Sequence, residues 1–151
     1  MKKVRVQSQP GHTYAMQISD GRHELASDES VADGGEDGGP SPYELLLASL
    51  GACMAITMEM YARRKEWPLE SVALELSHEK LLAQDCEACT PAEIEAAGPR
   101  GRIDIIRTEI TLCGDLSAEQ VARLHEIAGR CPVHRTLEGS PKFVSSVSTS
   151  M

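Results

Sequence analysis

GPSPYELLLASLGACMAITMEMYARR, residues 39–64, predicts a long apolar helix around which the other elements pack. Residues 45–58 carry no charge and no proline, but this run is shorter than the roughly 20 apolar residues that a membrane span requires. It therefore predicts a helix buried in the core of a soluble protein. Ser41 and Glu44 have the spacing of a capping box, and Pro42 suits the first helical position, where its missing N–H costs nothing. The sequence thus indicates where the helix begins.

Size, charge and cysteine usage narrow the class of protein. A chain of 151 residues is long enough to form one domain, residues 1–151, with a core that needs no disulfides. A net charge of −8 and only one Trp and one Phe argue against nucleic-acid binding. No apolar run follows the N-terminal lysines, and the odd number of cysteines, five, favours thiols over a disulfide framework. We expect a cytoplasmic protein that binds neither nucleic acid nor membranes.

Three short strands are predicted ahead of the long helix. Residues 3–8, 12–19 and 22–27 have strand-like patterns, and the turn pairs Pro10-Gly11 and Asp20-Gly21 separate them. The N-terminal part is therefore an antiparallel meander. Residues 28–39 are acidic and hold four glycines, which predicts a mobile loop before the helix.

Two longer strands are predicted after the helix, which should end at Trp67-Pro68. Residues 71–81 and 102–113 each place apolar side chains on one face. Between them lies a polar insert, residues 82–101, interpreted as a long hairpin connection. The apolar positions that define the two faces are Val72, Leu74 and Leu76 in the first strand and Ile106, Ile110 and Leu112 in the second.

A second helix and a final strand complete the predicted α+β fold. Ser117 and Gln120 form a second capping box, and Pro132 interrupts the helix and pushes Cys131 out of the α region. A last strand is predicted over residues 142–147, so that the order is βββ-α-ββ-α-β with antiparallel pairs. The apolar stripe of the helix contains Val121, Leu124, Ile127 and Ala128.

Cys53 and Cys131 are the candidates for thiol chemistry. Cys53 fits equally well as a buried structural cysteine or as a nucleophile, the latter if the helix breaks at Gly51 and places the thiol near a new N-terminus. Cys131 lies in RCPVHR, where the basic neighbours favour a thiolate, although solvated charges around a helix-end cysteine explain the same pattern. As a pair they suggest a redox couple in which one thiol becomes a sulfenic acid and the other condenses with it.

The remaining candidate residues have competing structural explanations. Cys86 and Cys89 form a C-x-x-C flanked by acidic residues, which favours incidental or regulatory disulfide chemistry. A metal site there would need further ligands, and only His78 is near in sequence. Cys113 is interpreted as structural. Glu44 could orient a catalytic group or move a proton, but its capping role already explains it.

The motifs SPYELLLASLGAC (residues 41–53) and RCPVHRTL (residues 130–137) resemble those of the OsmC/Ohr family of thiol-dependent hydroperoxide reductases. The predicted order of strands and helices agrees with that family over nearly the whole chain. The resemblance implies an OsmC-like fold with antiparallel sheets around a long central helix. It also implies an intertwined homodimer, in which each active site lies at the subunit interface.

The resemblance also implies a chemistry. It makes Cys53 the peroxidatic and Cys131 the resolving cysteine of an enzyme that reduces organic hydroperoxides or hydrogen peroxide in oxidative stress defence. It implies a dithiol reductant, such as dihydrolipoyl groups, and no metal or other cofactor.

Two positions depart from the family pattern. His12 stands where the characterised reductases carry an arginine, and Tyr43 stands where they carry a glutamate. Arg22 and Arg135 are candidates to replace that arginine, and His12, Glu44 and Arg22 are candidates for positioning the peroxide. The departures keep two alternatives open, a non-enzymatic small-molecule binder and a thiol redox sensor. In a third alternative, the insert is a metal-binding module.

Overall fold

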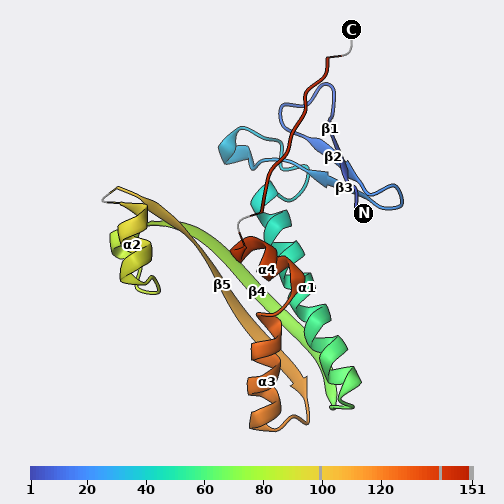
Figure 1. The fold of residues 1–151 in the computed structure, drawn as a ribbon. Helices are drawn as coiled ribbons and strands as arrows, with labels where there is room; N and C mark the ends of the chain where they lie inside the picture. The colour runs from blue at the N-terminus through green and yellow to red at the C-terminus, as the bar shows by residue number, and fades with distance from the viewer. Residues whose placement is uncertain (99, 140, 150–151) are drawn as a thin grey trace. The chain divides into compact units, whose positions relative to one another are not determined.

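The computed structural model describes residues 1–98, 100–139 and 141–149 (Figure 1). Antiparallel strands alternate with helices, so the predicted α+β class is confirmed. In chain order the elements are β1 (Arg5–Ser8), β2 (Met16–Ser19), β3 (Glu24–Ser27), η1 (Val31–Asp33), α1 (Pro42–Arg64), β4 (Leu69–Leu82), η2 (Ala83–Asp85), α2 (Pro91–Ala97), β5 (Arg102–Gly114), α3 (Ala118–Ala128) and α4 (Pro132–Glu138).

The chain divides into two compact units, each made of two sequence segments. The first unit consists of residues 1–48 and 77–106, and the second of residues 49–76 and of the chain from residue 107 onward. The long elements α1, β4 and β5 have residues in both units. That the whole chain is one domain stays a prediction.

The first unit begins with the predicted meander, a three-stranded sheet in the order β1-β2-β3. Its strands are shorter than predicted, because turns extend into their ends. The Gln9 N–H donates to the Ala15 carbonyl at 2.9 Å, which leaves His12 in the turn before β2. The Asp20 carboxylate accepts the backbone N–H groups of Arg22 and His23 at 2.9 and 2.8 Å, which delays β3 until residue 24.

Asp28 holds together the glycine-rich loop that precedes α1. The residue is only 3% exposed, and its carboxylate accepts the N–H groups of Glu29, Glu36 and Gly38 at 2.8, 3.1 and 3.1 Å. These backbone donors lower the pKa of the Asp28 carboxyl against the opposing effect of burial. The loop therefore has a defined hydrogen-bond network and a short 3-10 helix, which its composition did not predict.

α1 begins where the sequence predicts. The Ser41 N–H and hydroxyl donate to the Glu44 carboxylate at 2.7 and 2.8 Å, and the Glu44 N–H donates back to the Ser41 hydroxyl. The helix is continuous from Pro42 to Arg64, so the break at Gly51 that would place Cys53 near a new N-terminus does not occur. A Cβ on Gly51 would lie 2.8 Å from Leu76 Cδ1, so the glycine allows β4 to pack closely on the helix.

The core of the second unit is formed where α1 and α3 bury apolar side chains. The buried positions of α1 recur about every fourth residue, which places them on one face. The predicted stripe of α3 is confirmed except for Val121, which is 42% exposed. The buried residues are Leu50, Met54, Met58 and Ala62 from α1, and Leu124, Ile127 and Ala128 from α3.

The opposite face of α1 is apolar and exposed in the single chain. Ile56 and Met60 are 55% and 68% exposed, so the prediction of a fully buried helix is only half right.

With 23 residues and a mean hydropathy of 1.6 over its most apolar window, α1 has the length and composition of a membrane-spanning helix. Core helices of soluble proteins have the same properties, and α1 already packs one face against α3, so this is weak evidence for a membrane span.

β4 and β5 pair as a long two-stranded sheet with the predicted alternation of half-buried and exposed residues. The insert between them is more ordered than predicted, because it contains η2 and the helix α2. A capping box formed by Thr90 and Glu93, with Pro91 in the first turn, starts α2. This is the signal that predicted α1, so the sequence also carried the information for α2.

The C-terminal part differs most from the prediction. α3 ends at Ala128 with Gly129 as its C-cap, so Pro132 does not interrupt it but begins α4. Cys131 lies outside the α region as predicted, in the extended N-cap conformation with φ −64° and ψ 146°. The strand predicted over residues 142–147 is wrong, since residues 141–149 form no regular secondary structure. Phe143 and Val144 are 92% and 97% exposed, so the strand-like alternation finds no partner strand among the described residues.

Candidate active site

The second unit brings Cys53 and Cys131 together. Cys53 lies on α1, where Thr57, one turn further, donates its hydroxyl to the Cys53 carbonyl at 2.6 Å. Cys131 is the N-cap of α4, and its sulfur accepts the His134 N–H at 3.3 Å. The Cys53 side chain interacts with the Cys131 thiol and raises the pKa of Cys131. Two cysteines far apart in sequence thus form one thiol pair.

Burial distinguishes the two thiols. Cys131 is 0% exposed, whereas Cys53 is partly accessible. Burial raises the pKa of the Cys131 thiol, and the hydrogen bond and charge interaction with Cys53 raise it further. The N–H groups of Val133 and His134 lower this pKa, but their effect is smaller than that of burial. Cys131 is therefore held as a protonated thiol beside a more accessible sulfur.

The basic residues around Cys131 do not produce the thiolate that its sequence suggests. Arg130 and Arg135 are exposed at the surface, and burial decides the direction of the Cys131 pKa shift. The interpretation that RCPVHR favours a thiolate at this position is therefore wrong. The position of Cys131 as the N-cap affects its thiol more than these arginines do, because it turns the sulfur toward the first N–H groups of α4.

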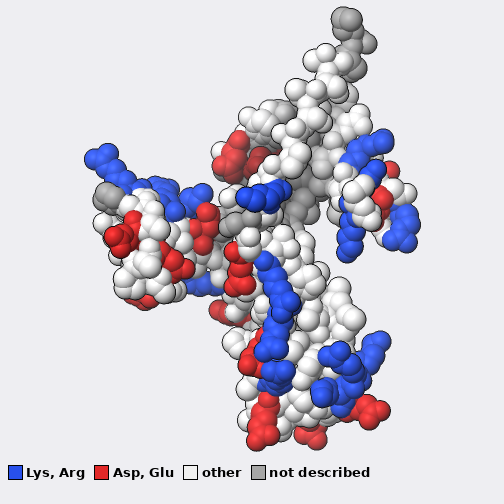
Figure 2. All heavy atoms as spheres, in the orientation of Figure 1, with Lys and Arg blue, Asp and Glu red and all other residues white. Residues whose placement is uncertain are grey.

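A groove of about 720 Å³ adjoins the thiol pair within the second unit. Its lining includes Thr57, one turn after Cys53, and the residues on either side of Cys131, but neither thiol is itself a lining residue. Its floor is apolar, with arginines among the lining residues, and Figure 2 shows Lys and Arg side chains gathered at the C-terminal end of α1. The lining residues are Thr57, Met60, Tyr61, Arg63, Arg64, Ile127, Arg130 and Pro132.

Tyr61 is surrounded by cations at the edge of this groove. Arg64, Lys65 and Arg123 lie 5.5 to 6.0 Å from the centre of its ring, and Arg123 Nε also donates to the phenol oxygen at 3.2 Å. This hydrogen bond, followed by the charges of the three cations, lowers the pKa of the Tyr61 phenol. The groove therefore combines an apolar surface with a locally positive potential in a chain of net charge −8.

Glu44 and Tyr43 have contacts of their own in the first unit. The hydrogen bonds from Ser41 lower the pKa of the Glu44 carboxyl, so Glu44 caps α1 as an anion. Tyr43 stacks on His78 with the ring centres 4.3 Å apart, and His78 Nε2 lies 2.8 Å from the Asp104 carboxylate. The glutamate that the family resemblance places at position 43 is thus replaced by an aromatic residue with a ring partner.

His12 and Arg22 also belong to the first unit. His12 Nδ1 lies 2.9 Å from the Glu36 carboxylate, in the turn before β2. Arg22 is exposed in the turn between β2 and β3, where its backbone N–H binds Asp20. Roles of these two residues in positioning a peroxide stay predictions.

Cys86 and Cys89 are joined by a disulfide, with their Cα atoms 5.5 Å apart. His78, the third candidate metal ligand, instead binds Asp104. No group of three or more metal-ligating side chains lies together in the described part of the chain. The geometry gives no support to a metal-binding insert.

Sequence reasoning missed Thr57 and the arginines of the groove. The helical spacing of Cys53, Thr57, Met60 and Arg64 puts these residues on neighbouring turns of α1, and this spacing can be recognised in the sequence. Ile127, Arg130 and Pro132, which complete the groove, come from a distant segment, and their approach to α1 depends on tertiary packing.

A family model described as OsmC-like protein matches residues 34–146. No curated protein matches the chain. Among solved structures, a protein of Psychrobacter arcticus 273-4, provisionally assigned to osmotic stress and detoxification responses, is 21% identical with a TM-score of 0.68. That alignment covers 90% of this chain and 88% of the other.

Two further solved structures have the same fold. The OsmC-like protein from Mycoplasma pneumoniae is 17% identical with a TM-score of 0.67, and the alignment covers 93% of this chain and 89% of the other. The organic hydroperoxide resistance protein OhrB of Bacillus subtilis is 17% identical with a TM-score of 0.60, and the alignment covers 93% and 92%. At these identities the structural likeness establishes the fold.

Proposed function

The chain belongs to the OsmC-like family, and from this premise we propose that it is a thiol-dependent peroxidase that reduces organic hydroperoxides through Cys53 and Cys131. The observation that carries the proposal is the pairing of a partly accessible thiol with a buried, protonated one. A peroxidase of this kind needs one sulfur that the substrate can reach and a second that reacts only after the first is oxidised.

In the first step, the Cys53 thiolate attacks one oxygen of the hydroperoxide and breaks the O–O bond. The sulfur becomes a sulfenic acid, and the other oxygen leaves as an alkoxide that takes up a proton to give the alcohol. The Cys131 thiol, which burial keeps protonated, can donate a hydrogen bond to the Cys53 sulfur before the reaction.

In the second step, the Cys131 sulfur attacks the Cys53 sulfenic acid. A disulfide forms between the two cysteines, and the hydroxyl group leaves as water after taking up the thiol proton. Because burial keeps Cys131 protonated, it is a poor target for peroxide itself and is preserved for this step. A dithiol then reduces the disulfide by thiol–disulfide exchange, which completes the cycle.

The groove beside the thiol pair supports an organic substrate over hydrogen peroxide. Met60, Ile127 and Pro132 offer an apolar surface to the carbon skeleton of a hydroperoxide. A molecule as small as hydrogen peroxide would bury none of this surface. The second candidate activity, a redox sensor that reacts with peroxide but is not recycled, uses the same two thiols.

A homodimer is supported by the apolar surface that the single chain leaves exposed. Ile56 and Met60 lie on one face of α1, and exposed Val6 and Leu25 lie in the meander. Surfaces of this kind generally mark an interface with another chain. We expect a dimer in solution, and a substitution of Ile56→Glu should shift the mass measured by light scattering toward the monomer.

A peroxidase assay tests the proposal. Cumene hydroperoxide is mixed with the reduced protein and dihydrolipoamide, and the remaining peroxide is measured, with Cys113→Ser as the matched control because Cys113 is an exposed thiol outside the pair. We expect many turnovers in the parent and in Cys113→Ser, and none in Cys53→Ser. One equivalent consumed without turnover would favour the sensor. A reaction no faster than that of free cysteine would end both candidates.

A further inference from the structure

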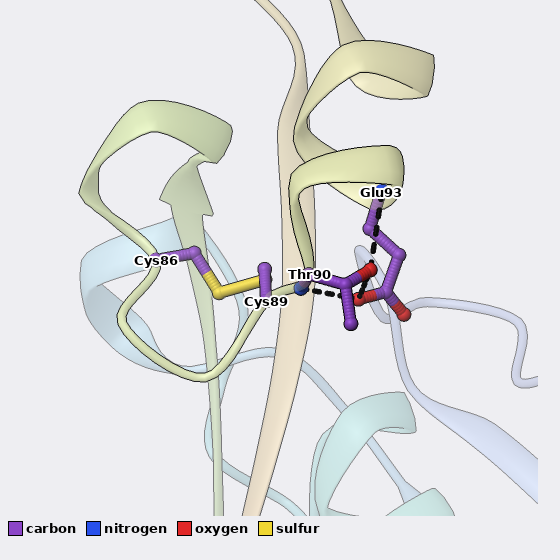
Figure 3. The surroundings of a disulfide bond; sticks show 4 residues. All are labelled: Cys86, Cys89, Thr90 and Glu93. Carbon is purple, nitrogen blue, oxygen red and sulfur yellow. Dashed lines mark hydrogen bonds between the residues drawn. A yellow bond between two sulfur atoms is a disulfide. The ribbon is translucent and has the colours of Figure 1, made fainter.

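The insert between β4 and β5 contains a disulfide of its own within the first unit. Cys86 and Cys89 follow η2 and precede α2, as Figure 3 shows, and only three positions separate them in sequence. The three remaining cysteines carry free thiols. The chain thus holds a second pair of sulfurs whose chemistry the peroxidase proposal does not use.

The disulfide closes the short turn between the buried end of η2 and the start of α2. Cys86 is only 6% exposed and its neighbour Ala83 only 2% exposed, so this end of the loop is anchored. α2 has seven residues, none of them buried, and helices of that length are not stable alone. Its own stabilisation comes from the capping box, in which the Thr90 N–H and hydroxyl donate to the Glu93 carboxylate at 2.7 and 2.8 Å (Figure 3).

The two sulfurs differ in accessibility. Cys86 is buried, whereas Cys89 is partly exposed at the start of α2. An incoming thiolate can therefore reach the Cys89 sulfur, with Cys86 as the leaving group. Thiol–disulfide exchange depends on such access and on which sulfur is attacked.

We propose that Cys86 and Cys89 form a second redox site, a substrate for dithiols, whose reduction releases α2 from the insert. A thiolate of the dithiol attacks Cys89 Sγ, the disulfide bond breaks, and Cys86 leaves as a thiolate that takes up a proton. The second thiol of the reductant then attacks the mixed disulfide and releases Cys89, so the dithiol is oxidised to a cyclic disulfide and both cysteines become thiols. The insert is ordered when oxidised and open when reduced.

This site is independent of the peroxidase proposal. Its sulfurs lie in the first unit and those of Cys53 and Cys131 in the second. Access selects the attacked sulfur, because Cys89 is partly exposed whereas Cys86 is buried. The insert is therefore expected to respond to a dithiol whether or not the chain consumes peroxide.

The test uses the full chain with Cys53, Cys113 and Cys131 replaced by serine, so that only the disulfide pair remains. Dithiothreitol is added, free thiols are counted by alkylation and mass, and the protein is digested briefly with a glutamate-specific protease. We expect two thiols to appear without loss of the circular dichroism signal, and cleavage after Glu93 and Glu95 to become about tenfold faster as α2 opens. Reoxidation should restore the slow rate.

Two comparisons make the outcome decisive. In a Cys86→Ser/Cys89→Ser variant, cleavage at these glutamates should be fast with or without dithiothreitol. If the serine background fails to fold, the parent protein is treated identically and its thiols are assigned by peptide mapping. The proposal is overturned if the untreated protein has free thiols at both positions, if reduction requires unfolding, or if cleavage changes by less than twofold.

Discussion

Cys53 and Cys131 are distant in sequence and keep free thiols, whereas Cys86 and Cys89 are three positions apart and are joined in a disulfide. The first pair combines a helix face with a helix cap, and the second pair closes a single turn. Basic residues flank Cys131 and acidic residues flank the short pair. The sequence suggested a reactive thiolate at Cys131, which burial of this thiol opposes, and disulfide chemistry in the insert, which the bond between Cys86 and Cys89 bears out.

The comparison teaches that burial decides the state of a thiol more than the charges beside it in sequence do. Desolvation acts on the charged form of the Cys131 sulfur itself, and the side chains of Arg130 and Arg135 are exposed to solvent, which screens them. In the insert, a short loop places two sulfurs within bonding distance, whatever charges lie nearby. Cys86 and Cys89 form a disulfide because they lie close together in one turn. Cys53 and Cys131 differ because Cys131 is buried and Cys53 is partly accessible.

The largest expected effect separates the two pairs by activity. Cys53→Ser should lower the rate of cumene hydroperoxide consumption by about 10³-fold or more, because the nucleophile is removed. The Cys86→Ser/Cys89→Ser variant should retain the parent rate within about twofold. The assay is the one described above, with thiols reduced beforehand. Equal losses in both variants would abolish the distinction between the pairs.

Cys131→Ser should separate the first oxidation from turnover. One equivalent of peroxide should react at nearly the parent rate, but the sulfenic acid at Cys53 should persist because no partner thiol condenses with it. Trapping with dimedone and mass measurement should give one adduct at Cys53 in this variant and almost none in the parent. An undiminished turnover rate in Cys131→Ser would show that another thiol resolves the intermediate.

The disulfide of the insert should contribute modestly to stability. Closing a loop of this length removes about 2 kcal/mol of unfolded-state entropy in the chain-entropy model. Urea unfolding of the parent and of Cys86→Ser/Cys89→Ser, both with the other three cysteines replaced, should differ by that amount. A difference of zero would mean that the insert unfolds before the rest of the chain and leaves the main transition unaffected.

The smallest expected effect is on the pH dependence of stability. The raised pKa of Cys131 means that the native state holds its proton more tightly than the unfolded state does. The resulting stability is fully present below the ordinary thiol pKa of 9.0 and is lost as the pH rises through the higher native value. The parent should therefore lose more urea resistance than Cys131→Ala between pH 8 and pH 10, and parallel curves would contradict the assignment.

Local signals predicted much of this molecule. The capping boxes at Ser41 and Ser117 placed the starts of α1 and α3, and alternation placed β4 and β5, because these patterns depend on residues within one element. The box at Thr90 was present but overlooked, and α2 was missed with it. The strand predicted over residues 142–147 failed because alternation shows only that a segment suits a sheet, and does not supply the neighbouring strand.

The site was predictable in its residues but not in its arrangement. Cys53 and Cys131 could be named from sequence and family resemblance, whereas their approach depends on the packing of α3 against α1. The groove depends on the same packing. The direction of the Cys131 pKa shift could not be read from RCPVHR, since it depends on the burial of the sulfur in the folded chain.

The pairing of Cys53 with Cys131 is tested most directly by peptide mapping after one equivalent of cumene hydroperoxide. The reduced protein is treated, quenched with an alkylating reagent and digested without reductant. We predict loss of two thiols and a cross-linked peptide that joins Cys53 to Cys131, with Cys113 alkylated in full. A stable product oxidised only at Cys53, or a cross-link from Cys53 to any other cysteine, would contradict the account.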